Sequence, residues 1–232
     1  MDSIVQAILE SIGSYQPRAP ELLSKFGDFR ALASAVLTEV LARSSDHLLE
    51  LANASYVHGN GFEKLVCGES KPGGSKIRFH FWPPTERTTQ IHDHGWSFYS
   101  HILFGSISCT EYEFSPEAGP HSVYRLPNLP NWKAGNGVEC VARNARLRRL
   151  AERSLTIGQG YGLTPNKLHE VRVTDSSGAV TLVLQSCHTQ KYSHVVLNSG
   201  EFVANAYPRT KLPVALFVER LNVIRKLVCA GD

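Results

Sequence analysis

The chain has no long hydrophobic run, no paired cysteine motif and little net charge. None of its apolar stretches approaches the roughly eighteen residues that a membrane span requires. A net charge of +3 is too small to indicate a nucleic-acid or membrane partner. The five cysteines are scattered and form no C-x-x-C pair, which argues against a disulfide framework or a zinc ribbon. No basic segment precedes an apolar one at the N-terminus, so we expect a soluble, cytoplasmic protein with reduced thiols.

The hydrophobic pattern changes its period twice and contains no internal repeat. We interpret the chain as one domain with three parts: a helical segment over residues 1–55, a β-barrel over 56–200, and a C-terminal extension with a helix over 201–232. The helical segment is expected to pack on the barrel. A content of 42% hydrophobic and 19% charged residues is ordinary for such a globular domain.

Apolar residues recur at helical spacing near both ends of the chain. The pattern predicts one helix from Ile4 to Ile12, a second that opens at Pro20, a third over 32–41 and a short fourth in SSDHLLELA (44–52). A last amphipathic helix is expected after Pro213.

The middle of the chain consists of short β-rich segments divided by Gly, Pro, Asp and Ser. One example is SKIRFHFW (75–82), which alternates as a strand does and ends at a Pro-Pro pair. Many such strands predict a sandwich or barrel. Residues 115–153 break the pattern: they predict a loop rich in Pro and Gly, followed by a short basic helix in VARNARLRRLAER (141–153). We expect this insertion to present a solvated helix face or to cover a barrel mouth.

Two histidines stand one residue apart in IHDHGWSFYSHILFGSI (91–107). Residues two apart in a strand point to the same side, so His92 and His94 are a poor choice for packing and a good pair of metal ligands. A third histidine, His169, begins a later strand after a turn bounded by Gly and Pro.

This arrangement resembles the two motifs of the cupin superfamily, and within it the cysteine dioxygenase-like thiol dioxygenases. The matching pieces are FHFW (79–82), IHDH (91–94), FGSI (104–107) and LHEV (168–171). The resemblance implies a mainly β, double-stranded β-barrel (jelly roll) in which His92, His94 and His169 bind ferrous iron. The glutamate of the first cupin motif is replaced by Phe98 or Tyr99, so the ligand set contains no carboxylate.

Two features depart from the thiol dioxygenases. Their Ser-x-His-x-Tyr relay corresponds here to TLVLQ, with Thr181, Val183 and Gln185 in its place. Their early-strand arginine, which holds the substrate carboxylate, corresponds to the neighbourhood of Lys64, and Arg78 lies on the next strand. We therefore expect a small chelating substrate that is thiol-like or amino-acid-like, without assigning cysteine itself.

Seven residues are candidates for the cavity around the metal. The candidates for catalysis are Tyr99, a phenol close to the first motif that would donate a proton, and Gln185. The candidates for substrate contact are Lys64, Arg78, His80, Trp96 and Phe98. Aromatic residues of the barrel core would show the same pattern. Asp93 is expected to support the ligands or cap a loop, and His101 to point away from the metal.

Three functions remain open. The first is a mononuclear non-heme iron(II) oxygenase that uses dioxygen on a small molecule. The second is a metal-dependent isomerase, decarboxylase or hydrolase that needs no oxygen, and the third is a ligand-binding cupin without catalysis. The expected partners are a small-molecule substrate and dioxygen, and the expected assembly is a monomer or homodimer.

Overall fold

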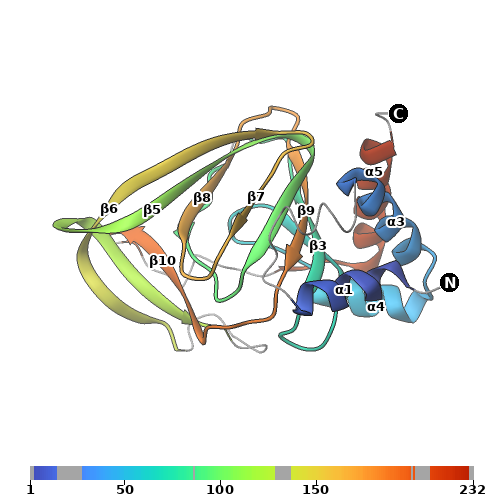
Figure 1. Cartoon of the computed structure of the whole chain (residues 1–232), viewed down its shortest axis with the longest axis horizontal. Coiled ribbons are helices and arrows are strands. Elements are labelled where there is room, and N and C mark those ends of the chain that lie inside the picture. The colour runs from blue at the N-terminus through green and yellow to red at the C-terminus, as the bar shows by residue number, and fades with distance from the viewer. Residues whose placement is uncertain are drawn as a thin grey trace.

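The computed structural model describes residues 3–14, 28–85, 87–128, 137–199, 201 and 210–229. Strands hold more of these residues than helices do, and helices from both ends of the chain gather on one side of the strands (Figure 1). The structure confirms the predicted fold class in its architecture: mainly β, with antiparallel strands, N-terminal helices and a C-terminal helix. Among the described residues, no helix has the length and apolar character needed to cross a membrane.

The helices follow the predicted amphipathic pattern. They are α1 (Ile4–Ser14), α3 (Phe29–Leu41), α4 (Ser45–Ala54) and α5 (Val214–Cys229). Asp28 and Ser44 cap the N-termini of α3 and α4 by accepting hydrogen bonds from backbone N–H groups of the first turn. The helix predicted to open at Pro20 lies outside the described residues.

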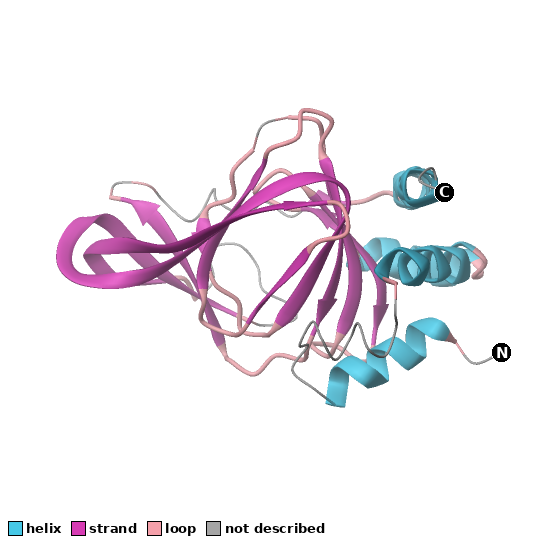
Figure 2. Cartoon of the chain, turned by 45° about the horizontal axis from the view of Figure 1, so that its top comes forward, coloured by secondary structure: helices cyan, strands magenta, loops and turns pink. Residues whose placement is uncertain are grey.

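The strands form one eleven-stranded antiparallel sheet over the described residues, folded round a common interior (Figure 2). Their bounds are β1 (Tyr56–Val57), β2 (Glu63–Glu69), β3 (Lys76–Trp82), β4 (Ile91–His92), β5 (Phe98–Pro127), β6 (Glu139–Thr156), β7 (Gly160–Leu163), β8 (Leu168–Val173), β9 (Ala179–Gln185), β10 (Tyr192–Asn198) and β11 (Thr210–Lys211).

The outer face of β2, β3, β9 and the start of β5 carries the largest core cluster of the molecule. Leu65, Phe79 and Leu182 lie opposite one another on these strands and are fully buried against the helices. Side chains alternate between the two faces of a strand, so the neighbours of these residues point into the barrel. The helices thereby cover the outer face of these strands and leave their inner face to the site.

Strand β5 passes from one half of the barrel to the other. Its first part pairs with β9 and β7, and after Gly105 it pairs with β8, β6 and finally β10. Gly105 has a φ of 71°, and a Cβ there would lie 2.0 Å from the Gly178 carbonyl oxygen. This bend therefore requires glycine.

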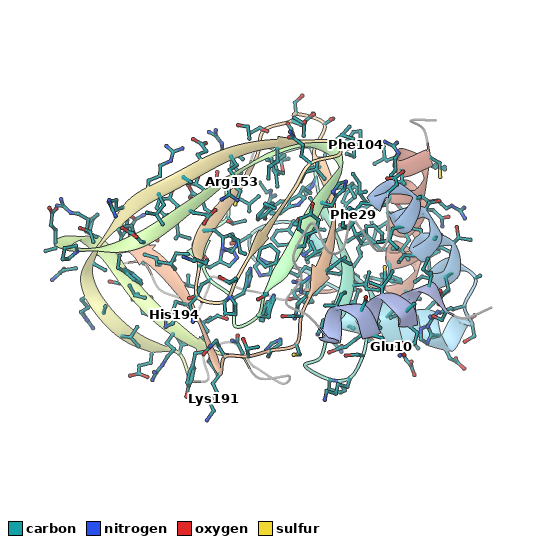
Figure 3. All side chains as sticks on the ribbon, in the orientation of Figure 1. Glu10, Phe29, Phe104, Arg153, Lys191 and His194 are labelled. Carbon is teal, nitrogen blue, oxygen red and sulfur yellow. The ribbon has the colours of Figure 1, made fainter. Side chains whose placement is uncertain are left out.

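The loop and the basic helix predicted over residues 115–153 are wrong. The described residues of that stretch continue β5 to Pro127 and form most of β6, and the two strands pair with each other from Ser106–Thr156 to Arg125–Glu139. The basic segment is therefore a strand, although Arg, Leu and Ala favour helices. Cross-strand ion pairs such as Arg153–Glu111 and Arg146–Glu117 place its charges opposite glutamates of β5 (Arg153 is labelled in Figure 3).

Candidate metal centre

Three histidines meet inside the barrel. His92 on β4 lies directly opposite His169 on β8 in the antiparallel register. His94 follows two residues later, and its carbonyl oxygen accepts a hydrogen bond from the backbone N–H of Asn166, in the turn before β8. One potential ligand atom from each of His92, His94 and His169 lies within 4.8 Å of the others. The three histidines that the family resemblance implied as ligands are thus brought together, although more than seventy residues separate His94 from His169.

The imidazoles are neutral and oriented for ligation. Burial lowers the pKa of His92 and His94 well below the usual value. Repulsion from His169 lowers both further, and His92 also acts on His94. Burial likewise lowers the pKa of His169 to about 4. Nδ1 of His92 lies 2.7 Å from the Gln90 carbonyl oxygen, and Nδ1 of His169 lies 3.1 Å from that of Lys167. In a neutral ring Nδ1 must then donate, which leaves Nε2 with the lone pair that a metal takes.

Asp93, between the two histidines of the first motif, is turned toward β10. Its carboxylate accepts hydrogen bonds from the backbone N–H of His194 and, at 2.8 Å, from His194 Nδ1. The Asp93 side chain is 3% exposed, so this contact is shielded from water. It supports the ligand-bearing segment, as predicted for Asp93. The identity of its partner was missed, because nothing in the local sequence connects two residues 101 positions apart.

Aromatic rings surround the histidine cluster. Trp96 stacks on His94 at 4.7 Å between ring centroids and also contacts His188. Phe98 contacts His94 edge-on at 5.3 Å and lies 5.8 Å from His169. Trp96 lines the cavity, as predicted. Phe98 does not line it and belongs to the barrel core, so the predicted substrate contact of Phe98 is wrong.

A cavity of about 540 Å³ opens onto the cluster. His92 and His94 line it together with the predicted residues Lys64, Arg78, Trp96 and Gln185. These predicted residues lie on β2, β3 and β9 and in the loop after β4, so elements far apart in sequence contribute to one wall.

His80 is on the same strand as Arg78 but does not line this cavity. Its ring lies 4.8 Å from Phe62 and 6.3 Å from Trp82 in the barrel core. Burial lowers its pKa well below the usual value, and the charges of Arg78 and Lys64 lower it further. His80 is therefore a neutral imidazole near the cavity rather than a wall residue.

Tyr99 is not brought to the cluster. It points from β5 toward the helices, where its ring lies 5.2 Å from that of Phe29 and belongs to the outer core cluster. Its neighbour Phe98 takes the inward position because adjacent strand residues face opposite sides. The predicted proton donor is thus on the wrong face. His101 also stacks on Phe29, at 4.6 Å, in keeping with the prediction that it faces away (Phe29 is labelled in Figure 3).

The donor set fits a divalent transition metal. Among the described residues, this is the one group of three or more His, Cys, Asp or Glu side chains close enough to share an ion. Three neutral imidazoles suit iron, copper, nickel and zinc. Three protein ligands also leave positions of a six-coordinate ion free for other molecules.

Comparison with known proteins gives only distant similarities to solved structures. No family model and no curated protein matches the chain. A hydroquinone 1,2-dioxygenase in complex with Cd²⁺ and 4-hydroxybenzonitrile is similar over 60% of this chain and 70% of its own, with 13% identity and a TM-score of 0.36. A Klebsiella pneumoniae protein with a double-stranded β-helix domain matches 68% of this chain and 93% of its own, with 12% identity and a TM-score of 0.35. An oxalate oxidase in complex with glycolate matches 68% of this chain and 65% of its own, with 10% identity and a TM-score of 0.33.

Proposed function

We propose that the protein is a mononuclear non-heme iron(II) oxygenase of the cupin type that acts on a small chelating substrate. The observation that carries the proposal is the cluster of His92, His94 and His169, whose ligand atoms lie within 4.8 Å of one another at the edge of a substrate-sized cavity. Bound ferrous iron would supply a centre at which a chelating substrate and dioxygen meet.

The residues of the chain prepare such a site in two ways. The buried histidines remain neutral, because burial opposes their protonation, and so their lone pairs are available at neutral pH. The absence of a carboxylate ligand leaves the full double charge of the ion in place, which favours anionic donor atoms from the substrate. The rings of Trp96 and Phe98 exclude water beside the ligands.

The relay tyrosine of the thiol dioxygenases corresponds to Gln185 in this chain, and Tyr99, the other phenol considered, faces the helices. This supports an oxygenation whose proton transfers do not depend on Tyr99. The substrate class stays thiol-like or amino-acid-like in this proposal, and we further propose a cytoplasmic monomer or homodimer.

The experiment is to load the purified protein with ferrous iron, measure the bound metal, and record dioxygen uptake with cysteine and other small thiols and with amino acids. The proposal expects about one iron per chain and substrate-dependent oxygen consumption that the His169→Ala variant loses. Stoichiometric zinc without oxygen uptake would contradict it. Turnover that continues under anaerobic conditions would favour a Lewis-acid isomerase, decarboxylase or hydrolase instead.

A further inference from the structure

Asn166 is one of two residues other than glycine that have a positive φ in the described part of the chain. Its φ of 63° lies in the left-handed region, which L residues other than asparagine and aspartate seldom adopt. Such a conformation persists where the surrounding structure requires it, often at functional sites. Asn166 is exposed in the turn before β8, three residues before His169, so packing of its side chain does not explain the conformation.

Backbone groups of this turn hold two of the three candidate metal ligands. The Asn166 N–H donates to the His94 carbonyl oxygen at 3.2 Å. The carbonyl oxygen of the next residue, Lys167, lies 3.1 Å from Nδ1 of His169 and accepts from it in the neutral ring. The turn therefore ties His94 to His169, although these two histidines come from different motifs of the sequence.

His94 depends on this contact more than the other two ligands do. Strand β4 ends at His92, so the pairing of β4 with β8 fixes His92 against His169 and does not include His94. The ring of His94 stacks on Trp96. Among the described residues, however, the Asn166 N–H is the one hydrogen-bond partner of His94, whereas the rings of His92 and His169 each bond to a carbonyl oxygen.

The residues on either side of His94 are tied to other parts of the barrel. Asp93 bonds to β10, and the Gly95 carbonyl oxygen accepts from two N–H groups of the loop before β10. These contacts place the segment against β10 and its loop, and they do not touch the turn that carries His169. The spacing between His94 and His169 therefore depends on the Asn166 turn.

We infer that Asn166 is a positioning residue of the metal centre, whose left-handed backbone sets the separation of His94 from His169. A negative φ at this residue would change the chain direction, so its N–H and the Lys167 carbonyl could not point at both histidines together. Asparagine suits the place because its short polar side chain tolerates a positive φ, whereas a β-branched side chain does not. The inference rests on the proposed function only in its metal centre, and no oxygen chemistry enters it.

The test compares variants at two asparagines that share this backbone conformation. Asn166→Val introduces a β-branched residue that disfavours a positive φ, and Asn166→Gly keeps that φ available. Asn144→Val makes the same change at the other position, where φ is 56°. Asn144 lies on β6, which pairs with β5 and not with the strands that carry the histidines. Asn166→Ala is the milder substitution for use if Asn166→Val does not fold.

The first measurement is the affinity for cobalt(II), obtained by competition with a chelator, together with the visible spectrum of the bound ion. We expect Asn166→Val to bind cobalt at least about tenfold more weakly and with an altered spectrum, as when other residues that orient metal ligands are changed. Asn166→Gly should bind within about threefold of the parent, because glycine adopts the same φ. Asn144→Val should lower the urea midpoint as Asn166→Val does, yet bind cobalt as the parent does.

The second measurement needs no metal: backbone amide hydrogen exchange of the metal-free protein. The amide of residue 166 should be at least about tenfold better protected in the parent and in Asn166→Gly than in Asn166→Val, because only the left-handed turn brings it to the His94 carbonyl oxygen.

Three results would overturn the inference: cobalt affinity in folded Asn166→Val or Asn166→Ala equal to that of the parent, an equal loss of affinity in Asn144→Val, or an unprotected Asn166 amide in the parent. If the parent binds no cobalt, the proposed function fails, and the exchange measurement still decides whether Asn166 sets the spacing of the two histidines.

Discussion

Asp93 and His194 join the metal-ligand segment to β10 through three hydrogen bonds. The backbone N–H of Asp93 donates to the His194 carbonyl oxygen at 3.0 Å, and the Asp93 carboxylate accepts from the backbone N–H of His194 at 2.6 Å and from its Nδ1 at 2.8 Å. The carboxylate raises the pKa of His194, mainly through this hydrogen bond. His92 and His94 flank Asp93, so their backbone position depends on this contact.

We predict that Asp93→Asn weakens metal binding about tenfold, within the range seen when outer-shell partners of metal sites are removed. The same change should lower the free energy of unfolding by about 1–3 kcal/mol, because hydrogen bonds to a buried charge are replaced by neutral ones. Competition with a chelator measures the first effect and urea denaturation the second. Asp175→Asn, in an exposed turn, is the control for both. Unchanged metal affinity in Asp93→Asn would remove the supporting role assigned to this carboxylate.

The third ligand can be tested separately from the first two. His169→Ala is expected to bind the metal at least about a hundredfold more weakly, because two imidazoles and a water molecule replace three imidazoles. Metal content after dialysis against a weak chelator reports the loss. His101→Ala is a matched control, because His101 lies on the outer face against Phe29 and should keep its metal. Equal metal retention in the two variants would show that His169 is not a ligand.

The buried histidines also predict how stability depends on pH. In the folded, metal-free protein the pKa values of His92, His94 and His169 lie below those of the unfolded chain, chiefly because of burial. The unfolded state then binds more protons at mildly acidic pH, so stability is full above about pH 6.5 and falls as the pH drops toward about 4. His194, whose pKa is raised, acts in the opposite direction: its contribution is present at low pH and is lost as the pH rises through its folded pKa.

Urea titrations of metal-free protein at a series of pH values between about 7 and about 4 measure this slope. His169→Asn should show a shallower fall, because one of the histidines whose pKa is lowered by burial is gone. A stability that stays constant over this range would mean that the imidazoles are already solvated or charged in the folded protein.

The sequence predicted the helix stripes and the histidine cluster. The helix stripes of α1, α3 and α5 are buried as their spacing indicates. His92 and His94 lie together as predicted, although β4 ends at His92 and His94 lies in the loop after it. It misplaced Tyr99, because a bare sequence does not show which face of β5 is the inner one. The prediction of a helix over 141–153 failed for another reason. Most of this part of β6 is exposed, and only Ala145, Leu147 and Ala151 are half-buried, so the apolar pattern of a strand is weak.

The bend of β5 offers a test of the fold. Gly105→Ala is expected to lower the free energy of unfolding by at least about 2 kcal/mol, because a positive φ is combined with a backbone clash. Gly158 also has a positive φ, but a Cβ there meets nothing within 4 Å. Gly158→Ala should therefore cost only about 1 kcal/mol. Chemical denaturation of the two variants gives the comparison, and equal losses would contradict the close approach of β5 to Gly178.

The most direct measurement of the central claim is X-ray absorption at the iron edge on protein loaded with ferrous iron. The account predicts about one iron per chain with the scattering pattern of three imidazole ligands, reduced to two in His169→Ala. A spectrum with fewer than three imidazoles in the parent protein, or one that His169→Ala leaves unchanged, would contradict it.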